Sequence, residues 1–381
     1  MKILFVQKVK AYAGSENWFT SIIPALIDKG IECELVCVIH PDNLPKLTNF
    51  KNVLDERKIP YHFIISKKDL SLKLLKSLKR ITNKGHFDLV HLNLIHAELW
   101  FSLLVSFFGL KTKLVSTIHG FDEGFQAEHG FNPNKVTNTK YIRILKFCEK
   151  RISSYYAVSQ GLENLVTKGG IIPKNKMRVI NYGFDYPKFK TNFSLPQFID
   201  KSKKTILVPG RIVEYKGQEK IIDSIAKLIE KGLNFKIIFA GDLQGEYGNY
   251  LKQKISDLGY TNYIEFLGHV SNLDEYFLSS DVIVLPSKSE GFGLVLLEAF
   301  NYEKPVITFN VPAFNETIEH NTTGLITPCF NIDELANNIN LLLTNQELAN
   351  RITVNAKKRL LDYYCLSRMV DETIAFYEEV L

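Results

Sequence analysis

The sequence predicts an α/β protein of two doubly wound parallel-sheet domains, and three observations lead to this fold class. Short β-rich runs alternate with helix-length segments, the alternation starts afresh near residue 205, and an aperiodic stretch rich in lysine separates the two series. The chain has 381 residues, of which 45% are hydrophobic and 23% charged, so it can bury two cores and is not a disordered or disulfide-stapled chain. We expect two facing domains with a cleft between them.

The first domain is predicted from six strand-like runs joined by segments long enough to be helices, which favours a parallel sheet. Ser159 follows the last of these runs and is expected to cap the next helix. The six runs are Ile3–Val6, Glu34–Ile39, His62–Ile65, Leu89–Leu92, Leu114–Ile118 and Tyr155–Val158.

The second domain follows an exposed linker at Lys188–Lys204, with a hinge expected at 185–204. Three helical segments close the chain, at Ile332–Leu343, Glu347–Asp362 and Leu366–Val380. The strand-like runs of this domain are Thr205–Pro209, Lys236–Ala240, Tyr263–Phe266, Val282–Leu285 and Val306–Thr308.

Charge is divided unevenly between the two halves. Residues 1–200 carry 29 lysines and arginines against 17 aspartates and glutamates, whereas residues 201–381 carry 18 against 24. The acidic second half and the lack of a recognised motif argue against a nucleic-acid partner. The basic first half suits an anionic acceptor or an anionic membrane surface.

Cysteine usage and hydropathy predict a cytoplasmic protein, at most peripheral on the inner face of the membrane. The five cysteines form no C-x-x-C pair, which is typical of a reduced compartment. The start of the chain has the pattern of a first strand rather than of a signal peptide. The apolar run Leu99–Leu110 is well short of the roughly 20 residues that a spanning helix needs.

A basic amphipathic segment lies at Lys67–Ile81, with Leu70, Leu74, Leu78 and Ile81 at helical spacing. We favour a surface helix that packs these leucines on the sheet. Its exposed lysines could also meet anionic lipid, and they are Lys73, Lys76 and Lys79. The aromatic residues of the following apolar run are expected to fill the core, and they are Trp100, Phe101, Phe107 and Phe108.

The stretch from 285 to 299 has the pattern of a strand, a glycine turn and a helix, with Glu290 and Glu298 eight residues apart. Eight helical residues rise about 12 Å, more than the roughly 5–9.5 Å between paired glycosidase carboxyls, so the two carboxylates are expected to hold different parts of one extended ligand. Backbone amides near Gly293 and Leu294, at the start of the helix, would face an anion.

Two cations, Arg211 and Lys216, lie five residues apart after Gly210, at the carboxyl end of a predicted strand. A guanidinium fork and a compact ammonium together suit a diphosphate. Taken alone, Arg211 or Lys216 would more readily be a surface cation. Glu290 alone could be an ordinary loop carboxylate, and Glu298 alone could be a helix acid that the helix dipole favours. Their combination favours a binding site.

These motifs resemble glycosyltransferase family 4, the retaining transferases of the GT-B fold, whose two domains are Rossmann-like. The E-x7-E signature of that family appears as Glu290 to Glu298, and the similarity continues through Lys304–Ile307, Asn315–Ile318 and Thr323–Ile326. The resemblance implies an acceptor-side domain at 1–190 and a nucleotide-sugar-binding domain at 191–365. A final helix at 366–381 would cross back to the first domain.

The resemblance also implies roles for single residues. Arg211 and Lys216 would hold the donor diphosphate, Glu298 the ribose and Glu290 the sugar hydroxyls. His119 would be the active-site histidine near the transferred sugar, with a structural histidine as the alternative, and a loop at 120–138 would face the acceptor. The other donor-binding residues, several acting through their backbone, would be Gly14, Gly210, Gly268, His269, Val270, Gly291, Phe292, Gly293 and Leu294.

The implied function is transfer of a sugar, with retention and without a metal cofactor, from a nucleoside-diphosphate sugar to a glycan or lipid-linked acceptor in bacterial surface-polysaccharide synthesis. The sequence contains no D-x-D pair. The alternatives are a GT-B sugar-nucleotide epimerase or phosphorylase, or a non-catalytic carbohydrate-binding or assembly protein. Departures from the family pattern leave the donor sugar open, and they are Ala13, Tyr182, Glu303 and Pro312–Ala313.

Overall fold

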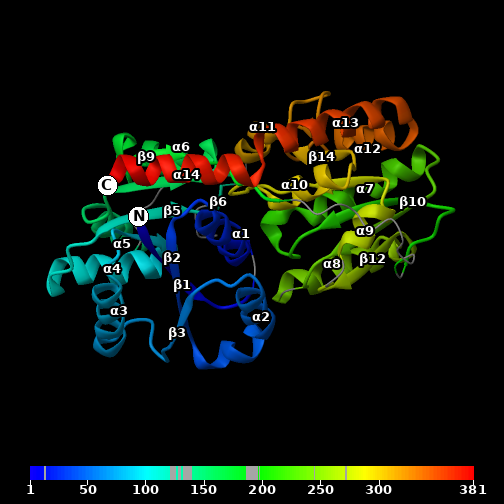
Figure 1. The fold of residues 1–381 in the computed structure, drawn as a ribbon. Coiled ribbons are helices and arrows are strands. Elements are labelled where there is room, and N and C mark those ends of the chain that lie inside the picture. Colours follow the sequence, from blue (N-terminus) through cyan, green and yellow to red (C-terminus); the bar gives the residue numbers. More distant parts are fainter. Residues whose placement is uncertain are drawn as a thin grey trace. The chain divides into compact units, whose positions relative to one another are not determined.

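The computed structural model describes residues 1–12, 14–120, 126–127, 130–131, 140–185, 196, 198–243, 245–270 and 273–381. The described residues form two compact units (Figure 1). Unit 1 holds those within 1–122, 133–185 and 364–381, and unit 2 holds those within 123–132 and 186–363. Much of the expected linker, at 188–195 and 197, and most of the expected 120–138 loop lie outside the described residues.

Unit 1 is built on a seven-stranded parallel sheet in the order β3-β2-β1-β4-β5-β8-β9. Strand β1 is central and pairs with β2 from Lys2↔Glu32 to Val9↔Ile39. Its residues Ile3–Val6 are fully buried, as expected for a parallel strand covered on both faces. The strands are β1 (Lys2–Val9), β2 (Glu32–Ile39), β3 (Tyr61–Ile65), β4 (Leu89–Asn93), β5 (Lys113–Ile118), β8 (Ser154–Ala157) and β9 (Met177–Val179).

Helices connect these strands. Ser159 caps α6 as predicted, because its Oγ accepts a hydrogen bond from the Leu162 amide at 3.2 Å. The helices are α1 (Gly14–Asp28), η1 (Pro41–Leu47), α2 (Thr48–Glu56), α3 (Leu72–Gly85), α4 (Leu94–Phe108), α5 (Lys140–Glu149), α6 (Gln160–Lys168), η4 (Lys174–Lys176) and α14 (Leu366–Val380).

Helix α3 confirms the expected surface helix. Leu74, Leu75 and Leu78 are buried. The helix begins later than the amphipathic pattern indicates, since Ser71 caps it by accepting a hydrogen bond from the Leu74 amide at 3.2 Å. Leu70 therefore lies before the helix and is exposed rather than part of its buried stripe.

Helix α4 confirms part of its predicted packing and corrects another part. Trp100 and Phe101 are buried in the core. The expectation that Phe107 fills the core is wrong, because its side chain is 73% exposed. The helix is apolar on nearly all sides, so its sequence does not distinguish the face against the sheet from the outer face.

Helix α14, drawn in red in Figure 1, packs within unit 1 although it follows unit 2 along the chain. Met369, Val370, Phe376 and Tyr377 are buried. The Tyr377 hydroxyl lies 2.5 Å from Nδ1 of the buried His91 in β4. At the other end of α14, the Arg368 guanidinium donates to the carbonyl oxygen of Asn181 at 2.8 Å.

Unit 2 repeats this architecture around a six-stranded parallel sheet in the order β12-β11-β10-β13-β14-β15. Its strands are β10 (Lys204–Pro209), β11 (Phe235–Ala240), β12 (Ile264–Gly268), β13 (Val282–Leu285), β14 (Val306–Phe309) and β15 (Leu325–Thr327). Its helices are η5 (Glu214–Lys216), α7 (Gln218–Glu230), α8 (Gly245–Asp257), η6 (Thr261–Tyr263), α9 (Leu273–Ser279), α10 (Leu294–Asn301), α11 (Pro312–Thr317), α12 (Ile332–Thr344) and α13 (Gln346–Tyr363). A short antiparallel pair, β6 (Gln126–Ala127) and β7 (Gly130–Phe131), also belongs to it.

Both sheets have the doubly wound strand order, in which the third, second and first strands are followed by the fourth, fifth and sixth. The predicted fold class of two Rossmann-like parallel-sheet domains is therefore confirmed. In such sheets, ligands bind beyond the carboxyl ends of the strands where the order reverses. These switch points lie between β1 and β4 in unit 1 and between β10 and β13 in unit 2.

Glu303 shows why one departure from the family pattern is unusual. Its φ of 52° lies in the left-handed region, which glycine enters at no steric cost and glutamate rarely adopts. Glu303 thus makes a left-handed turn before Lys304 and Pro305, at a position where the resemblance implies glycine.

Over the described part of the chain, no helix combines the length and apolar character that crossing a membrane requires.

Candidate functional site

The candidate site in unit 2 forms where two loops meet beyond adjacent strands. Strands β10 and β13 pair in register at Ile206↔Val282 and Leu207↔Ile283, so the segments that follow them leave the sheet at the same edge. The Lys288 amide donates to the Tyr215 carbonyl oxygen at 2.7 Å, which joins the two loops. A Cβ on Gly217 would lie 2.0 Å from the Pro286 carbonyl oxygen, so this close approach requires glycine.

The two loops bring Lys216 and Glu290 into direct contact. The Lys216 ammonium donates to Glu290 Oε1 at 2.5 Å, and the Ser287 hydroxyl donates to the same oxygen at 2.7 Å. Glu290 Oε2 has no hydrogen-bond partner among the residues that the structure describes. The pair is partly buried and presents both a cation and an open carboxylate oxygen.

Arg211 lies at the same edge, two residues beyond the end of β10, and its side chain is exposed. The guanidinium donates to the Tyr215 hydroxyl at 2.5 Å, while the Arg211 carbonyl accepts from Gln218 Nε2 at 2.9 Å. Gly210, with φ of 128°, makes the turn out of the strand. These contacts orient the guanidinium through Tyr215 and fix the backbone through α7.

Helix α10 begins directly after the Glu290 loop, with Gly293 as its N-cap residue at φ of 90°. A Cβ there would lie 2.5 Å from Phe314 Cε1, so the position requires glycine for space as well as for conformation. The Leu294 and Val295 amides have no hydrogen-bond partner within the described residues. Two free amides at a helix N-terminus make an anion-binding site.

Glu298 lies one turn into α10, whereas Glu290 lies in the loop before this helix, so the segment from 290 to 298 is not one continuous helix. Burial raises the pKa of the Glu298 carboxyl to about 7, and the nearby Asp274 carboxylate of α9 adds to the shift. No hydrogen bond to the Glu298 carboxylate occurs among the described residues. This acid therefore lacks the donors that would stabilise its charge.

The remaining predicted donor residues lie around the same sheet edge. Gly268 ends β12 with φ of 68° and bridges Gly241, and His269 follows with an exposed side chain. Val270 comes next and is partly exposed. In the Glu290 loop, Gly291 is partly exposed whereas Phe292 is buried.

His119 and Gly14 lie in unit 1. His119 follows β5, and both of its ring nitrogens are bonded within the protein: Nδ1 accepts from the Tyr182 hydroxyl at 2.5 Å, and Nε2–H donates to Asn93 Oδ1 at 2.6 Å. Burial lowers the pKa of His119 to about 3, so the ring is neutral. Gly14 begins α1, and the preceding Ala13 lies outside the described residues.

Several residues of these sites were not predicted from the sequence. Ser287 and Tyr215 orient Glu290 and Arg211, and Asp274 lies near Glu298. Tyr182, noted in the sequence only as a departure from the family pattern, bonds the His119 ring through its hydroxyl. Ser287 and Tyr215 lie within a few residues of charged motif positions, and this closeness was the signal that the sequence offered for them. The sequence offered no comparable signal for Asn93 or Asp274.

Unit 1 is expected to lose stability in mild acid through His91 and His119. Burial lowers the pKa of both below 6.5, so they stabilise the folded state above pH 6.5 and this stabilisation is lost as pH falls toward the folded pKa values. Buried Glu98, with a pKa raised to about 7, acts in the opposite sense between pH 4.5 and 7. Replacing His119 by glutamine should lower the pH slope of unfolding free energy by about 1.4 kcal/mol per pH unit.

Tryptophan fluorescence during urea unfolding at pH 5, 6 and 7 measures this slope. The protein has two tryptophans, Trp18 and Trp100, and both are buried in unit 1, so the signal reports that unit. His269→Gln, at an exposed histidine of unit 2, is the matched control. An unchanged slope in His119→Gln would show that His119 is not held neutral.

Comparison with known proteins identifies the family. The family described as Glycosyltransferase Family 4 matches residues 12–186, and the one described as Glycosyl transferases group 1 matches residues 190–359. An uncharacterized glycosyltransferase of Methanocaldococcus jannaschii is 27% identical over 373 residues, covering 93% of this chain and 91% of its own. The capsular polysaccharide biosynthesis glycosyltransferase CapM of Staphylococcus aureus is 28% identical over 247 residues, covering 63% of this chain and 64% of its own.

Among solved structures, HepE of Anabaena in complex with UDP and glucose has the same fold, with a TM-score of 0.81 and 22% identity over 100% of both chains. The two family matches together span nearly the whole chain and follow its two units. The chain belongs to glycosyltransferase family 4 and is a glycosyltransferase of the GT-B fold.

Proposed function

We propose that this glycosyltransferase transfers a sugar from a nucleoside-diphosphate sugar to a glycan or lipid-linked acceptor, with retention of configuration and without a metal cofactor. We place the reaction in bacterial surface-polysaccharide synthesis, as the name of the relative CapM suggests, at the inner face of the membrane. HepE, which shares the fold, is a protein that binds UDP and glucose. A nucleotide sugar is therefore the donor to test.

The observation that carries the proposal is the convergence of a cation, a carboxylate and an open helix N-terminus at the switch point of unit 2. The Lys216 ammonium has three N–H donors and uses one in its hydrogen bond to Glu290, so two remain for phosphate oxygens. Glu290 Oε2 can accept a sugar hydroxyl. In a nucleoside-diphosphate sugar, the phosphate is attached to one ring carbon and a hydroxyl to the next. This closeness of phosphate and hydroxyl matches the direct contact between Lys216 and Glu290.

The proposed reaction breaks the bond between the anomeric carbon and the diphosphate oxygen, and the electron pair leaves with the diphosphate. The acceptor oxygen bonds to the anomeric carbon on the same face, and its proton passes to an oxygen of the leaving diphosphate. Arg211, Lys216 and the amides of Leu294 and Val295 stabilise the charge that develops there. A neutral His119 serves beside the sugar as a hydrogen-bond partner rather than an acid.

The other predicted residues complete the donor site in this proposal. Glu298 receives the ribose hydroxyls, which supply the donors that its carboxylate lacks, and Gly268, His269 and Val270 line the nucleobase. Backbone groups supply the rest of the contacts, and they belong to Gly14, Gly210, Gly291, Phe292 and Gly293.

A thermal-shift screen of UDP, GDP, ADP and their sugars tests the proposed donor class. The nucleotide that binds should raise the melting temperature, by an amount that grows with its concentration above Kd. Product analysis by NMR with that donor then distinguishes a retained glycosidic bond from epimerisation or hydrolysis. A chain whose melting temperature none of these compounds changes would contradict the proposal.

Nucleotide affinity is expected to depend on the ionisation of Glu298. Ribose hydroxyls bind the ionised carboxylate better, so affinity should fall by up to about tenfold per pH unit below pH 7, where Glu298 becomes protonated. Glu298→Gln cannot titrate and should lack this component while keeping the pH dependence of the diphosphate itself. Isothermal titration of both proteins at pH 6, 7 and 8 measures the difference. If the nucleotide affinities of the two proteins change with pH in the same way, Glu298 does not bind the ribose and is a structural acid.

Metal independence has a direct test. Because Arg211 and Lys216 supply the positive charge in this proposal, chelation of divalent ions by EDTA should leave transfer unchanged. A loss of activity that magnesium or manganese restores would show that a metal ion shares this task.

A further inference from the structure

Helix α4 of unit 1 carries an apolar stripe that the core of the unit does not fully bury. On α4, Leu99, Leu103 and Phe107 follow one another at four-residue intervals and so share one face of the helix. Leu99 and Leu103 are partly exposed, and Phe107 is 73% exposed. This stripe borders the buried side of α4, which carries Trp100, Phe101 and Leu104, because Leu103 and Phe107 each come three residues after a buried residue of the helix.

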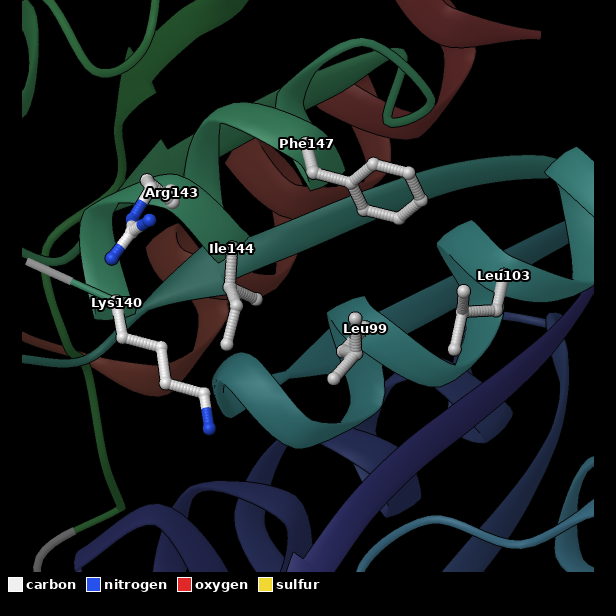
Figure 2. A pocket seen from close by; sticks show the side chains of 6 residues that line it. All are labelled: Leu99, Leu103, Lys140, Arg143, Ile144 and Phe147. Atoms are coloured by element: carbon white, nitrogen blue, oxygen red, sulfur yellow. The ribbon is translucent and has the colours of Figure 1, made fainter.

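Helix α5 turns this face into a groove of about 510 Å³ (Figure 2). Leu99 and Leu103 of α4 form one wall, and Ile144 and Phe147 of α5 form the other. Figure 2 shows Lys140 and Arg143 near one end of the groove, with Leu103 and Phe147 toward the other. The volume falls within the range of small-molecule pockets, about 300–1,000 Å³.

The charged end of this α4–α5 groove is cationic, and no acid among the residues that the structure describes pairs with it. Lys140 and Arg143 are exposed, and neither forms an ion pair or hydrogen bond with the described residues. Glu149, the only acid of α5, is paired with Lys176 at 2.8 Å, and the only acid of α4, Glu98, is buried. The groove therefore joins a positive end to an apolar floor, which complements a ligand with an anionic head and an apolar tail.

We propose that the α4–α5 groove binds an anionic phospholipid of the membrane surface. The lipid phosphate contacts Lys140 and Arg143, the first part of an acyl chain packs along Leu99, Leu103, Ile144 and Phe147, and Phe107 enters the interfacial region beside it. Basic residues near an anionic bilayer and apolar side chains at its interface both favour this position. The inference rests on the proposed membrane location but not on the proposed transfer reaction.

The structure favours this groove over the basic helix α3 as the main lipid contact. Three leucines of α3 are buried in the core, so most of the apolar face beneath its lysines is already used by unit 1. Lys73, Lys76 and Lys79 can supply charge at a distance, whereas the α4–α5 groove supplies charge and apolar surface together.

Vesicle flotation of the full chain tests the proposal, with phosphatidylglycerol vesicles compared with phosphatidylcholine vesicles. We expect binding to phosphatidylglycerol alone, and at least a tenfold loss in Lys140→Glu/Arg143→Glu. Phe107→Ser should weaken binding without altering the fold, since the side chain is exposed. Lys231→Glu/Lys252→Glu, at exposed lysines of unit 2, makes the same change in net charge and should retain wild-type binding.

The outcomes separate the groove from the other proposals. Wild-type flotation of the Lys140/Arg143 variant, or loss only in Lys73→Glu/Lys76→Glu/Lys79→Glu, would overturn the groove and leave a membrane contact elsewhere. Failure of the wild-type chain to bind either vesicle would overturn both the groove and the membrane location. Competition by glycerol phosphate as strong as that by a short-chain phosphatidylglycerol would show a phosphate site without lipid recognition. In every case the nucleotide-induced thermal shift reports separately on the donor site.

Discussion

Replacing Arg211 by alanine is expected to lower kcat by about 10²–10³-fold, the usual cost of removing one preorganised charge donor from an active site. The guanidinium lies at the carboxyl edge of β10 and is oriented by Tyr215, so its loss removes positive charge from the place where we propose that the diphosphate departs. The side chain is exposed, and therefore the fold should tolerate the change. Steady-state transfer assays with the donor found by thermal shift measure the effect.

Arg351→Ala is the matched control for this prediction. Arg351 is an exposed arginine of α13 in the same unit, so its loss changes net charge equally and should leave transfer unchanged. Values of kcat and KM for Arg211→Ala that are both close to wild type would refute the diphosphate role. A rise in KM with kcat unchanged would instead mean that Arg211 binds ground state and transition state equally.

Replacing Tyr377 by alanine is expected to destabilise unit 1 by about 3–5 kcal/mol, the range for removing a large buried aromatic side chain. Tyr377 is fully buried and bonds the ring of His91 at the centre of the sheet. Removing the whole segment Ser367–Leu381 should have a larger effect, since it also exposes the core that Phe376 and Met369 cover. Urea unfolding followed by tryptophan fluorescence measures both.

Glu378→Ala provides the comparison, because Glu378 is the next residue of α14 and is exposed. It should change the unfolding free energy by less than about 0.5 kcal/mol, as surface substitutions do. A Tyr377→Ala protein as stable as Glu378→Ala would mean that the Tyr377 side chain does not stabilise unit 1. Tyr377→Phe, which keeps the ring and removes the hydroxyl, isolates the contribution of the bond to His91.

The sheets were largely predictable because parallel strands covered on both faces require continuous apolar runs. All eleven strand-like runs of the sequence analysis overlap strands of the structure. Within the two parallel sheets, β9 and β15 were missed, since each is an edge strand of three residues and three residues carry no period. The position of Phe107 was missed for a related reason, because an evenly apolar helix gives no signal for its buried side.

The chemistry of the site was predictable in its residue types but not in its contacts. Lys216 and Glu290 are 74 residues apart, and their contact depends on the pairing of β10 with β13, which follows from the crossover topology rather than from either motif. The Tyr182 hydroxyl bonds His119 from 63 residues away. Local spacing reports which groups follow a strand, whereas strand order decides which of those groups meet.

The packing of α14 determines the order in which the protein can fold as it is made. Unit 1 combines the described residues within 1–122 and 133–185 with residues 364–381, while almost all of unit 2 comes from one continuous stretch, 186–363, that is translated before α14. His91 and the strands around it lack their packing against Tyr377 until α14 has been made. Unit 2 can therefore complete its core first, although unit 1 begins earlier along the chain. Until α14 leaves the ribosome, the nascent chain exposes an apolar surface on unit 1, and this interval is when a chaperone would bind it.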